Sequence, residues 1–426
     1  MDQTEALIIE TIDRHREEIL EFARDIYSHA ELGYKEFQTS GKFVKKMEQL
    51  GLRTEKGFAI TGVKAYLNED KKENASLALL GELDALRIPE HAFANPETNA
   101  AHCCGHHAQM AGVFGAALAL TVPEIAEKLD GQVVFFATPA EEYGEIEFKN
   151  QLREQGKIRY GGGKCELLRI GAFDDIDLCL THHIRPGNEI LVGSGTGNGF
   201  VSKVIRVLGK ASHAAGAPEK GVNALSAASL GLQALGLNRE TFRDEDCVRV
   251  HPIITKGGNL VNVIPDEVVV ETLVRGKTIE AFTDAAKKTD RSFKAGAIAM
   301  GAKVEISTLP GYLPTLAEEA LPELKHAAEI SASGIPVIEA SGHAGGSTDV
   351  GDVQHLMPVY TFNTGGVKGG LHQIDFEVTD EEEAYIVTAK MFALAAYGLL
   401  KEKAQRSREL VDQYEPVFKN SAEYVE

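Results

Sequence analysis

Positive charge is scarce in this sequence. Its 426 residues include 44 lysines and arginines against 63 acidic residues, which gives a formal charge of −19. This excess of negative charge argues against nucleic acid or an anionic membrane surface as the main partner, because both are polyanions. A small anionic substrate is still compatible with it, since a metal ion or a few arginines reverse the field within one pocket.

Cysteine pairs and long apolar runs are also lacking. The five cysteines are odd in number and scattered, so they predict no disulfide framework, as is usual in a reducing cytosol. No apolar run approaches the roughly 20 residues that span a bilayer. The first residues, Met1 to Glu5, lack the basic-then-apolar pattern of a signal peptide. We therefore expect a cytoplasmic protein with no membrane partner.

Apolar strands alternate with helices through the first part of the chain. This alternation is typical of an α/β fold in which helices flank a mixed, mostly parallel sheet. The strands are nearly all apolar, as expected for strands that are buried on both faces. The expected helices cover residues 5–29, 39–50 and 105–120, and the expected strands cover residues 63–67, 76–83, 133–138 and 178–182.

A glycine-rich stretch at residues 193–199 indicates a hinge or linker, and the texture of the sequence changes after it. Beyond it the expected order is strand, helix, two strands, helix and strand. This is the split βαβ, ferredoxin-like arrangement, which predicts an inserted α+β domain. Its expected elements cover residues 201–208, 221–237, 249–254, 267–274, 278–300 and 303–308.

From about residue 311 the first pattern resumes. A helix at residues 316–331, a strand at 358–362 and a long helix at 381–400 are expected, followed by a polar tail from Ala404 that packs loosely. The sequence thus predicts two domains, with residues 1–195 and 311–426 forming one and residues 196–310 inserted into it.

Residue types that ligate metals follow the strands of the first domain. Each group alone has a plain structural interpretation, such as a solvated acidic turn or a packed histidine. Ligands in open α/β sheets bind beyond the carboxyl ends of strands, however, and five mixed donors suit two metal ions about 3.5–4 Å apart. The joint placement therefore predicts a dinuclear centre. The candidates are Cys104 and His106, the pair Glu141 and Glu142, His183, and His372.

Several longer motifs occur in one order along the chain. They are Gly-Glu-Leu-Asp-Ala-Leu at residues 81–86, Cys-Gly-His at 104–106, Pro-Ala-Glu-Glu at 139–142, Gly-Lys-Ala-Ser-His-Ala at 209–214, Asn-Val-Ile-Pro at 262–265 and Ser-Thr-Asp-Val-Gly-Asp at 347–352. With them the chain resembles the aminoacylase/carboxypeptidase-like family of dinuclear metallohydrolases. The nearest branch is that of the N-acyl-amino-acid amidohydrolases, which includes hippurate, indole-acetyl-amino-acid and aminobenzoyl-glutamate hydrolases.

The resemblance implies that Cys104 bridges two divalent metal ions. Four further residues are implied to complete the ligand set, namely His106, Glu142, His183 and His372. Zinc or manganese is expected, with cobalt or nickel as alternatives, because these ligand types separate the metals poorly. The implied reaction is hydrolysis of an amide bond in an N-acyl amino acid or an aminobenzoyl-glutamate-like compound.

The resemblance also implies the remaining roles. Glu141 is similar to the general base of the family, and His213 to a histidine of the inserted domain that stabilises the oxyanion, often in the partner subunit's site. Asn262 and Arg275 are implied to hold the substrate carboxylate, for which the arginine fork is well suited. The inserted domain is expected to act as a lid and to form a homodimer.

Three departures from the family pattern stand beside these matches. His107 replaces the usual aspartate, Gln109 the usual histidine and Arg87 the usual proline. We expect His107 and Gln109 to orient ligands rather than to bind metal. The charged segment at residues 143–159 is longer than usual, and it is either a lid or part of the substrate pocket beside the site, or a tolerated surface insertion.

Two other functions remain open at this level. A metallo-exopeptidase that cleaves dipeptides would share the fold, although a bridging cysteine favours the amidohydrolase branch. A degenerate protein that binds ligand without turnover would explain His107 and Gln109, although the implied ligands and base are all present.

Overall fold

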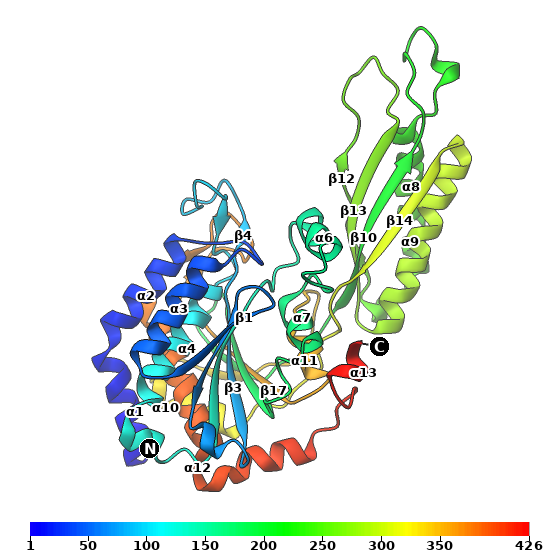
Figure 1. Cartoon of the computed structure of the whole chain (residues 1–426). Helices are drawn as coiled ribbons and strands as arrows, with labels where there is room; N and C mark the ends of the chain where they lie inside the picture. Colours follow the sequence, from blue (N-terminus) through cyan, green and yellow to red (C-terminus); the bar gives the residue numbers. More distant parts are fainter. Residues whose placement is uncertain (426) are drawn as a thin grey trace. The chain divides into compact units, whose positions relative to one another are not determined.

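The computed structural model describes residues 1–425, and it divides into two compact units (Figure 1). The second unit comprises Thr196–Thr315 and His343–Gly351. The first unit comprises Met1–Gly195, Leu316–Gly342 and the chain from Asp352 onward. The second unit therefore takes up a short stretch, His343–Gly351, that lies well beyond the boundary at residue 310 expected from the sequence.

The first unit is built on an eight-stranded sheet. Its four central strands, β6, β3, β7 and β17, run parallel to one another, whereas β2 pairs with β6, and β8 with β17, in antiparallel fashion. The expectation of a mixed, mostly parallel sheet flanked by helices is confirmed. In order across the sheet the strands are β1 (Arg53–Phe58), β2 (Gly62–Leu67), β6 (Gln132–Thr138), β3 (Ser76–Glu82), β7 (Leu178–Ile184), β17 (Val359–Thr364), β8 (Ile190–Val192) and β15 (Val337–Glu339).

Helix α4 (His106–Leu120) is the central helix of this unit, and all 15 of its residues are buried. A helix that is apolar all round belongs in a core. It packs against α12 (Thr388–Gln413), α2 (Arg16–Ser28) and α1 (Gln3–Arg14). Close approach to α12 requires Gly115, because a Cβ there would lie 2.5 Å from the Cβ of Ala389.

The helical stretch Glu382–Gln413 is long and apolar enough to pass a length-and-composition test for a membrane span. Of its most apolar window, 89% is buried inside the protein, as expected for the core helix of a globular domain. Its regular part ends where the sequence predicts, because the backbone from Lys401 to Ala404 is not helical.

Two expected helices differ from the structure. The helix expected at residues 5–29 is two helices, because the backbone breaks at His15. The helix expected from residue 316 begins only at Pro322, since Leu316 and Glu318 make extended-chain hydrogen bonds to Gln354 and Ser194. Local periodicity does not report such tertiary bonds.

The expectation of a loosely packed tail is wrong. After the non-helical residues 401–404 a second helical stretch of α12 runs to Gln413 with Leu410 buried, and α13 (Ser421–Val425) packs against α7 (Gly163–Arg169). The Tyr424 hydroxyl donates to Asp352 Oδ1 over 2.8 Å, so a polar tail is held by aromatic and hydrogen-bonding contacts rather than by an apolar run.

The second unit has the expected order of elements, with two helices packed on one antiparallel sheet (Figure 1). Strand β10 lies between β13 and β14, and β11 and β12 both pair with the other side of β13. The elements are β10 (Gly199–Leu208), α8 (Ala224–Asn238), β11 (Arg249–Val250), β12 (Ile253–Lys256), β13 (Glu267–Gly276), α9 (Ile279–Met300) and β14 (Lys303–Pro310).

Candidate metal centre

The candidate ligands meet at the carboxyl edge of the first unit's sheet. The turn that bears Glu142 follows β6, and His183 lies at the end of β7. Cys104 and His106 flank Gly105, which has φ 85° and precedes α4. A Cβ on Gly105 would lie 2.0 Å from Ile184 Cγ2, so only glycine allows this loop to approach β7.

The sulfur of Cys104 is shared by two groups of donors. It lies 3.3 Å from His183 Nε2 and 3.2 Å from His372 Nε2. His372 Nε2 also lies 3.1 Å from Glu142 Oε1. One group joins Cys104 with His106 and His183, the other joins it with Glu142 and His372, and within each group all donor atoms are within 4.8 Å of one another. Such spacings suit donors that bind one ion at about 2.0–2.3 Å.

The two imidazoles of the first group present the same nitrogen to a metal site. His106 Nδ1 lies 2.8 Å from the carbonyl oxygen of Asp84, and His183 Nδ1 lies 2.7 Å from that of Ile184. A carbonyl oxygen only accepts, so each Nδ1 carries the proton, and each Nε2 keeps a lone pair for a metal.

Two buried polar atoms in this centre lack hydrogen bonds. His106 Nε2 and Glu142 Oε1 have no hydrogen-bond partner among the described residues, although Glu82 Oε2 lies 3.2 Å from the first and His372 Nε2 3.1 Å from the second. These pairs are close without having hydrogen-bond geometry. Buried polar atoms are rarely left unsatisfied, and a bound cation would satisfy both.

The electrostatics of the centre favour a cation. Burial raises the pKa of the Cys104 thiol well above its usual value, and the charge of Glu142 adds to this. Burial opposes protonation of His106, but the charges of Glu82 and Cys104 outweigh it, so the pKa of His106 is raised well above its usual value. A thiolate at Cys104 thus requires added positive charge, which a divalent metal ion supplies. The donor set fits two such ions.

Glu82 joins one of the departures from the family pattern, Gln109, and a buried lysine to the centre. Gln109 Nε2 donates to Glu82 Oε2 over 2.7 Å, and the fully buried Lys164 lies 2.5 Å from Glu82 Oε1. Burial raises the pKa of Glu82, but Lys164 and His106 outweigh it and lower the pKa to about 2. Gln109 therefore orients a charged carboxylate beside His106 and lies outside both donor groups.

His107 also lies outside both donor groups. Its Nε2 is 3.2 Å from the hydroxyl of Tyr385, and its ring packs 4.7 Å from the ring of Tyr27. Burial lowers the pKa of His107 to about 3, so it is a neutral core residue.

The segment at residues 143–159 contacts the centre and is more than a surface insertion. It contains α6 (Ile146–Glu154), whose Lys149 is buried. Lys149 Nζ donates to the carbonyl oxygen of Glu142 over 2.6 Å. On the other side of the same residue, the Glu142 amide donates to Asp84 Oδ2 over 2.9 Å. The insertion thus helps to hold the backbone of a candidate ligand.

The other three predicted site residues, His213, Asn262 and Arg275, belong to the second unit. The structure brings the first two together and places Arg275 apart from them. His213 Nδ1 accepts hydrogen bonds from the amides of Ala215 and Gly216, so its exposed Nε2 carries the proton. The Ala214 amide donates to the Asn262 carbonyl oxygen, which brings His213 and Asn262 together.

Arg275 lies near the opposite end of β13 from Asn262, and its Nη1 donates to Ser347 Oγ over 2.7 Å. The eight steps along β13 from Glu267 to Arg275, at about 3.3 Å each, span roughly 26 Å, and Asn262 precedes that strand. Asn262 and Arg275 of one chain therefore do not hold the same carboxylate.

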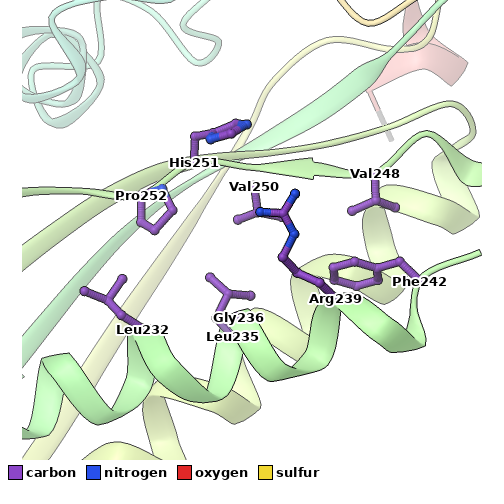
Figure 2. A pocket seen from close by; sticks show the side chains of 9 residues that line it. All are labelled: Leu232, Leu235, Gly236, Arg239, Phe242, Val248, Val250, His251 and Pro252. Carbon is purple, nitrogen blue, oxygen red and sulfur yellow. The ribbon is translucent and has the colours of Figure 1, made fainter. Parts of the chain in front are cut away.

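A separate cavity of about 240 Å³ lies in the second unit between α8 and β11 (Figure 2). Its lining is mainly apolar, with Arg239 and His251 as polar members. None of the predicted site residues is among the described residues that line it.

Two residues that support the centre escape sequence reasoning, namely Lys149 and Lys164. Lys164 follows three glycines and reads as part of a turn. Lys149 lies in a charged stretch that is typical of a solvated helix. Nothing local indicates that either ammonium is buried, because burial depends on distant segments.

The fold and the donor set define a hydrolase of the α/β class with a candidate dinuclear metal centre. Comparison with known proteins makes this assignment specific. The chain belongs to Peptidase family M20/M25/M40, whose model matches residues 78–397. It is an enzyme of a family whose members act on amide and peptide bonds. The resemblance found in the sequence is confirmed.

Relatives with different printed activities match most of the chain. The Xaa-Arg dipeptidase of Mus musculus is 27% identical over 408 residues, 93% of this chain and 85% of the relative. The N-acetylcysteine deacetylase of Bacillus subtilis is 26% identical over 399 residues, 90% and 97% of the two chains. A dinuclear metal-binding peptidase of the M20 family from Bacillus subtilis has the same fold, with a TM-score of 0.63 and 24% identity over 91% of this chain and 99% of its own.

Removing the positive partner of Glu82 should destabilise the first unit. Lys164→Met leaves a buried carboxylate without its ammonium, which costs about 3–5 kcal/mol. We expect a clear fall in the melting temperature of the metal-free protein, measured by calorimetry. The matched control is the double variant Glu82→Gln, Lys164→Met, which removes both charges and should recover much of the loss. Equal melting temperatures for Lys164→Met and wild type would contradict this role.

Proposed function

We propose that this enzyme hydrolyses the amide bond of N-acyl amino acids or aminobenzoyl-glutamate-like compounds to a carboxylic acid and an amino acid. The observation that carries the proposal is the sharing of the Cys104 sulfur by two groups of donors. A bridging cysteine is a feature of the amidohydrolase branch that the sequence resembles. The printed activity of the Bacillus subtilis relative, deacetylation of N-acetylcysteine, is of the same chemical class.

The centre holds two divalent metal ions in this proposal, with zinc or manganese preferred and cobalt or nickel as alternatives. The ligands are Cys104, His106, Glu142, His183 and His372. When bound, such ions lower the pKa of a water molecule toward about 7 and polarise a carbonyl group. The remaining work belongs to residues of the chain.

Glu141 is the general base in this proposal. It adjoins the ligand Glu142, and only 9% of its surface is exposed. A carboxylate oxygen of Glu141 takes the proton of the attacking water and later delivers it to the departing nitrogen. Partial burial suits both steps, because it keeps bulk water from competing for the proton.

His213 and Arg275 bind the substrate in this proposal. The bonds at His213 Nδ1 leave a proton on Nε2, and that donor stabilises the developing oxyanion. Arg275 holds the substrate carboxylate, and it supplies positive charge that a chain with a formal charge of −19 otherwise has in short supply. Asn262 and His213 are neighbours, so they act together at one site.

The separation of Asn262 from Arg275 supports a homodimer, in which one chain supplies Arg275 and its partner supplies the Asn262 loop. Strand β12 pairs only with β13 among the described residues, which leaves an edge for a second copy. Two of its side chains are exposed apolar groups, Ile253 and Ile254, at 62% and 43%. Leu260 and Val261 extend this apolar surface toward Asn262.

A dipeptidase is the second candidate, because the Mus musculus relative with that printed activity matches 93% of the chain. A dipeptide differs from an N-acyl amino acid by a free α-amino group, which its pocket must recognise. The two candidates therefore share the metal centre and differ in the acyl pocket.

Two substitutions separate metal binding from proton transfer. Cys104→Ala removes the shared donor and should lower the metal content below two ions per chain. Glu141→Gln retains all the proposed ligands, so it should keep two ions while kcat falls by about 10²–10⁴-fold. Metal content is measured by plasma mass spectrometry and turnover by amine release. Two ions in Cys104→Ala, or near wild-type kcat in Glu141→Gln, would show the respective role to be wrong.

A substrate panel distinguishes the two candidate functions. The enzyme is stripped of metal, reloaded with zinc or manganese, and given N-acyl amino acids, aminobenzoyl-glutamate and Xaa-Arg dipeptides. We expect metal-dependent release of free amine from N-acyl compounds. The same dipeptides with a blocked amino terminus serve as the control. Cleavage of free dipeptides alone would favour the dipeptidase.

The proposed dimer predicts the mass of two chains in light scattering of the full protein. Ile253→Asp places a charge on the exposed edge of β12 and should shift the mass toward one chain. Ile298→Asp is the matched control, because Ile298 is 81% exposed on α9 of the same unit. A wild-type mass of one chain would refute the dimer.

A further inference from the structure

The residue just before the proposed base has an unusual backbone conformation. Ala140 follows β6 and precedes Glu141, and its φ is 51°. This left-handed region is unfavourable for any residue with a Cβ. Ala140 is also fully buried, so solvent does not stabilise the turn. Something in the surrounding protein must hold it.

Both backbone polar groups of Ala140 have specific partners. Its amide donates to Glu36 Oε1 over 2.8 Å, and its carbonyl oxygen accepts from the Gly163 amide over 3.0 Å. Glu36 Oε2 in turn accepts from the Thr61 hydroxyl over 2.7 Å. The turn is therefore bound by a side chain that lies more than a hundred residues away along the sequence.

Close packing leaves this turn little room. A Cβ on Gly33 would lie 3.1 Å from the Cα of Ala140. A Cβ on Gly163 would lie 1.6 Å from the carbonyl oxygen of Pro139. The backbone of residues 139–140 thus packs directly on two glycines, and only one arrangement of the turn fits.

Burial of a glutamate at this position is energetically unfavourable. Glu36 is fully buried, and burial, with a further contribution from the charge of Asp84, raises its pKa to about 7. An apolar residue would avoid that cost, but it would leave the Ala140 amide without an acceptor. The acceptor is the property that the turn needs.

We propose that Glu36 is a positioning residue for Glu141: by binding the amide of the left-handed Ala140 it sets the direction in which the Glu141 carboxylate leaves the turn. The inference rests on the proposed role of Glu141 as the base. Asp84 holds the next-but-one amide, that of Glu142, so two carboxylates fix the base and its neighbouring ligand in succession.

The test compares four full-length variants loaded with zinc or manganese: Glu36→Ala, Glu36→Gln, Ala140→Gly, and the double variant Glu36→Ala, Ala140→Gly. Glutamine keeps an acceptor for the Ala140 amide, and glycine adopts φ 51° without strain. We expect Glu36→Ala to lower kcat by about 10- to 100-fold, since small misplacements of a reacting group have effects of this size. KM should stay within about threefold of wild type with two ions bound, and Glu36→Gln should stay within about threefold in kcat.

The kcat of the double variant should be at least about fivefold higher than that of Glu36→Ala, because glycine adopts the left-handed conformation without the hydrogen bond to Glu36. Glu5→Ala is the matched control: Glu5 is also a buried carboxylate that accepts a backbone amide, and it lies on α1. Its loss should lower the melting temperature without changing kcat.

Hydrogen exchange supplies a readout that does not depend on the reaction. In Glu36→Ala, peptides that cover residues 138–143 should exchange faster than in wild type and in Glu36→Gln. Faster exchange with unchanged kcat, or unchanged exchange, would overturn the inference. If Glu36→Ala does not fold, the double variant is the test. A folded and active double variant supports the positioning role of Glu36. A double variant that is unfolded, or whose kcat is as low as the value expected for Glu36→Ala, overturns it. A wild-type enzyme that hydrolyses no N-acyl compound refutes the proposed function. Hydrogen exchange at residues 138–143 then still tests whether Glu36 holds the turn.

Discussion

Buried charge is the constraint on which this molecule's centre depends. Glu82, Asp84 and Glu142 lie in an interior where an unpaired carboxylate is very costly. Lys164 satisfies Glu82, while Asp84 accepts the amide of Glu142. Two donor atoms, His106 Nε2 and Glu142 Oε1, are left without a hydrogen bond among the described residues, and both belong to the groups that share the sulfur of Cys104. The donor atoms that surround Cys104 therefore still require a positive charge.

One departure from the family pattern acts on the surroundings of the donors. Gln109 binds both the amide and the carboxylate of Glu82, which lies beside His106. His107 is a neutral histidine packed against Tyr385. His107 and Gln109 therefore do not indicate a degenerate site, because neither residue replaces a metal donor.

Much of the fold was predictable because its central strands are long apolar runs between turns. The strands at 76–83 and 133–138 were placed to within a residue of β3 and β6. Two of the errors share a cause. The late start of α10 (Pro322–Ser331) and the docked tail near Tyr424 both depend on bonds to distant segments. Local periodicity carries no information about such bonds.

The sequence by itself determined the donor types and the order of the elements that carry them. Side-chain chemistry and apolar periodicity are local properties, so Cys104, His106 and Glu142 were recognisable in place. Only the tertiary structure decided which charges are buried, as for Lys164, and how far apart Asn262 and Arg275 lie. Desolvation and distance are set by segments that meet only on folding, and this is why they could not be read from the chain alone.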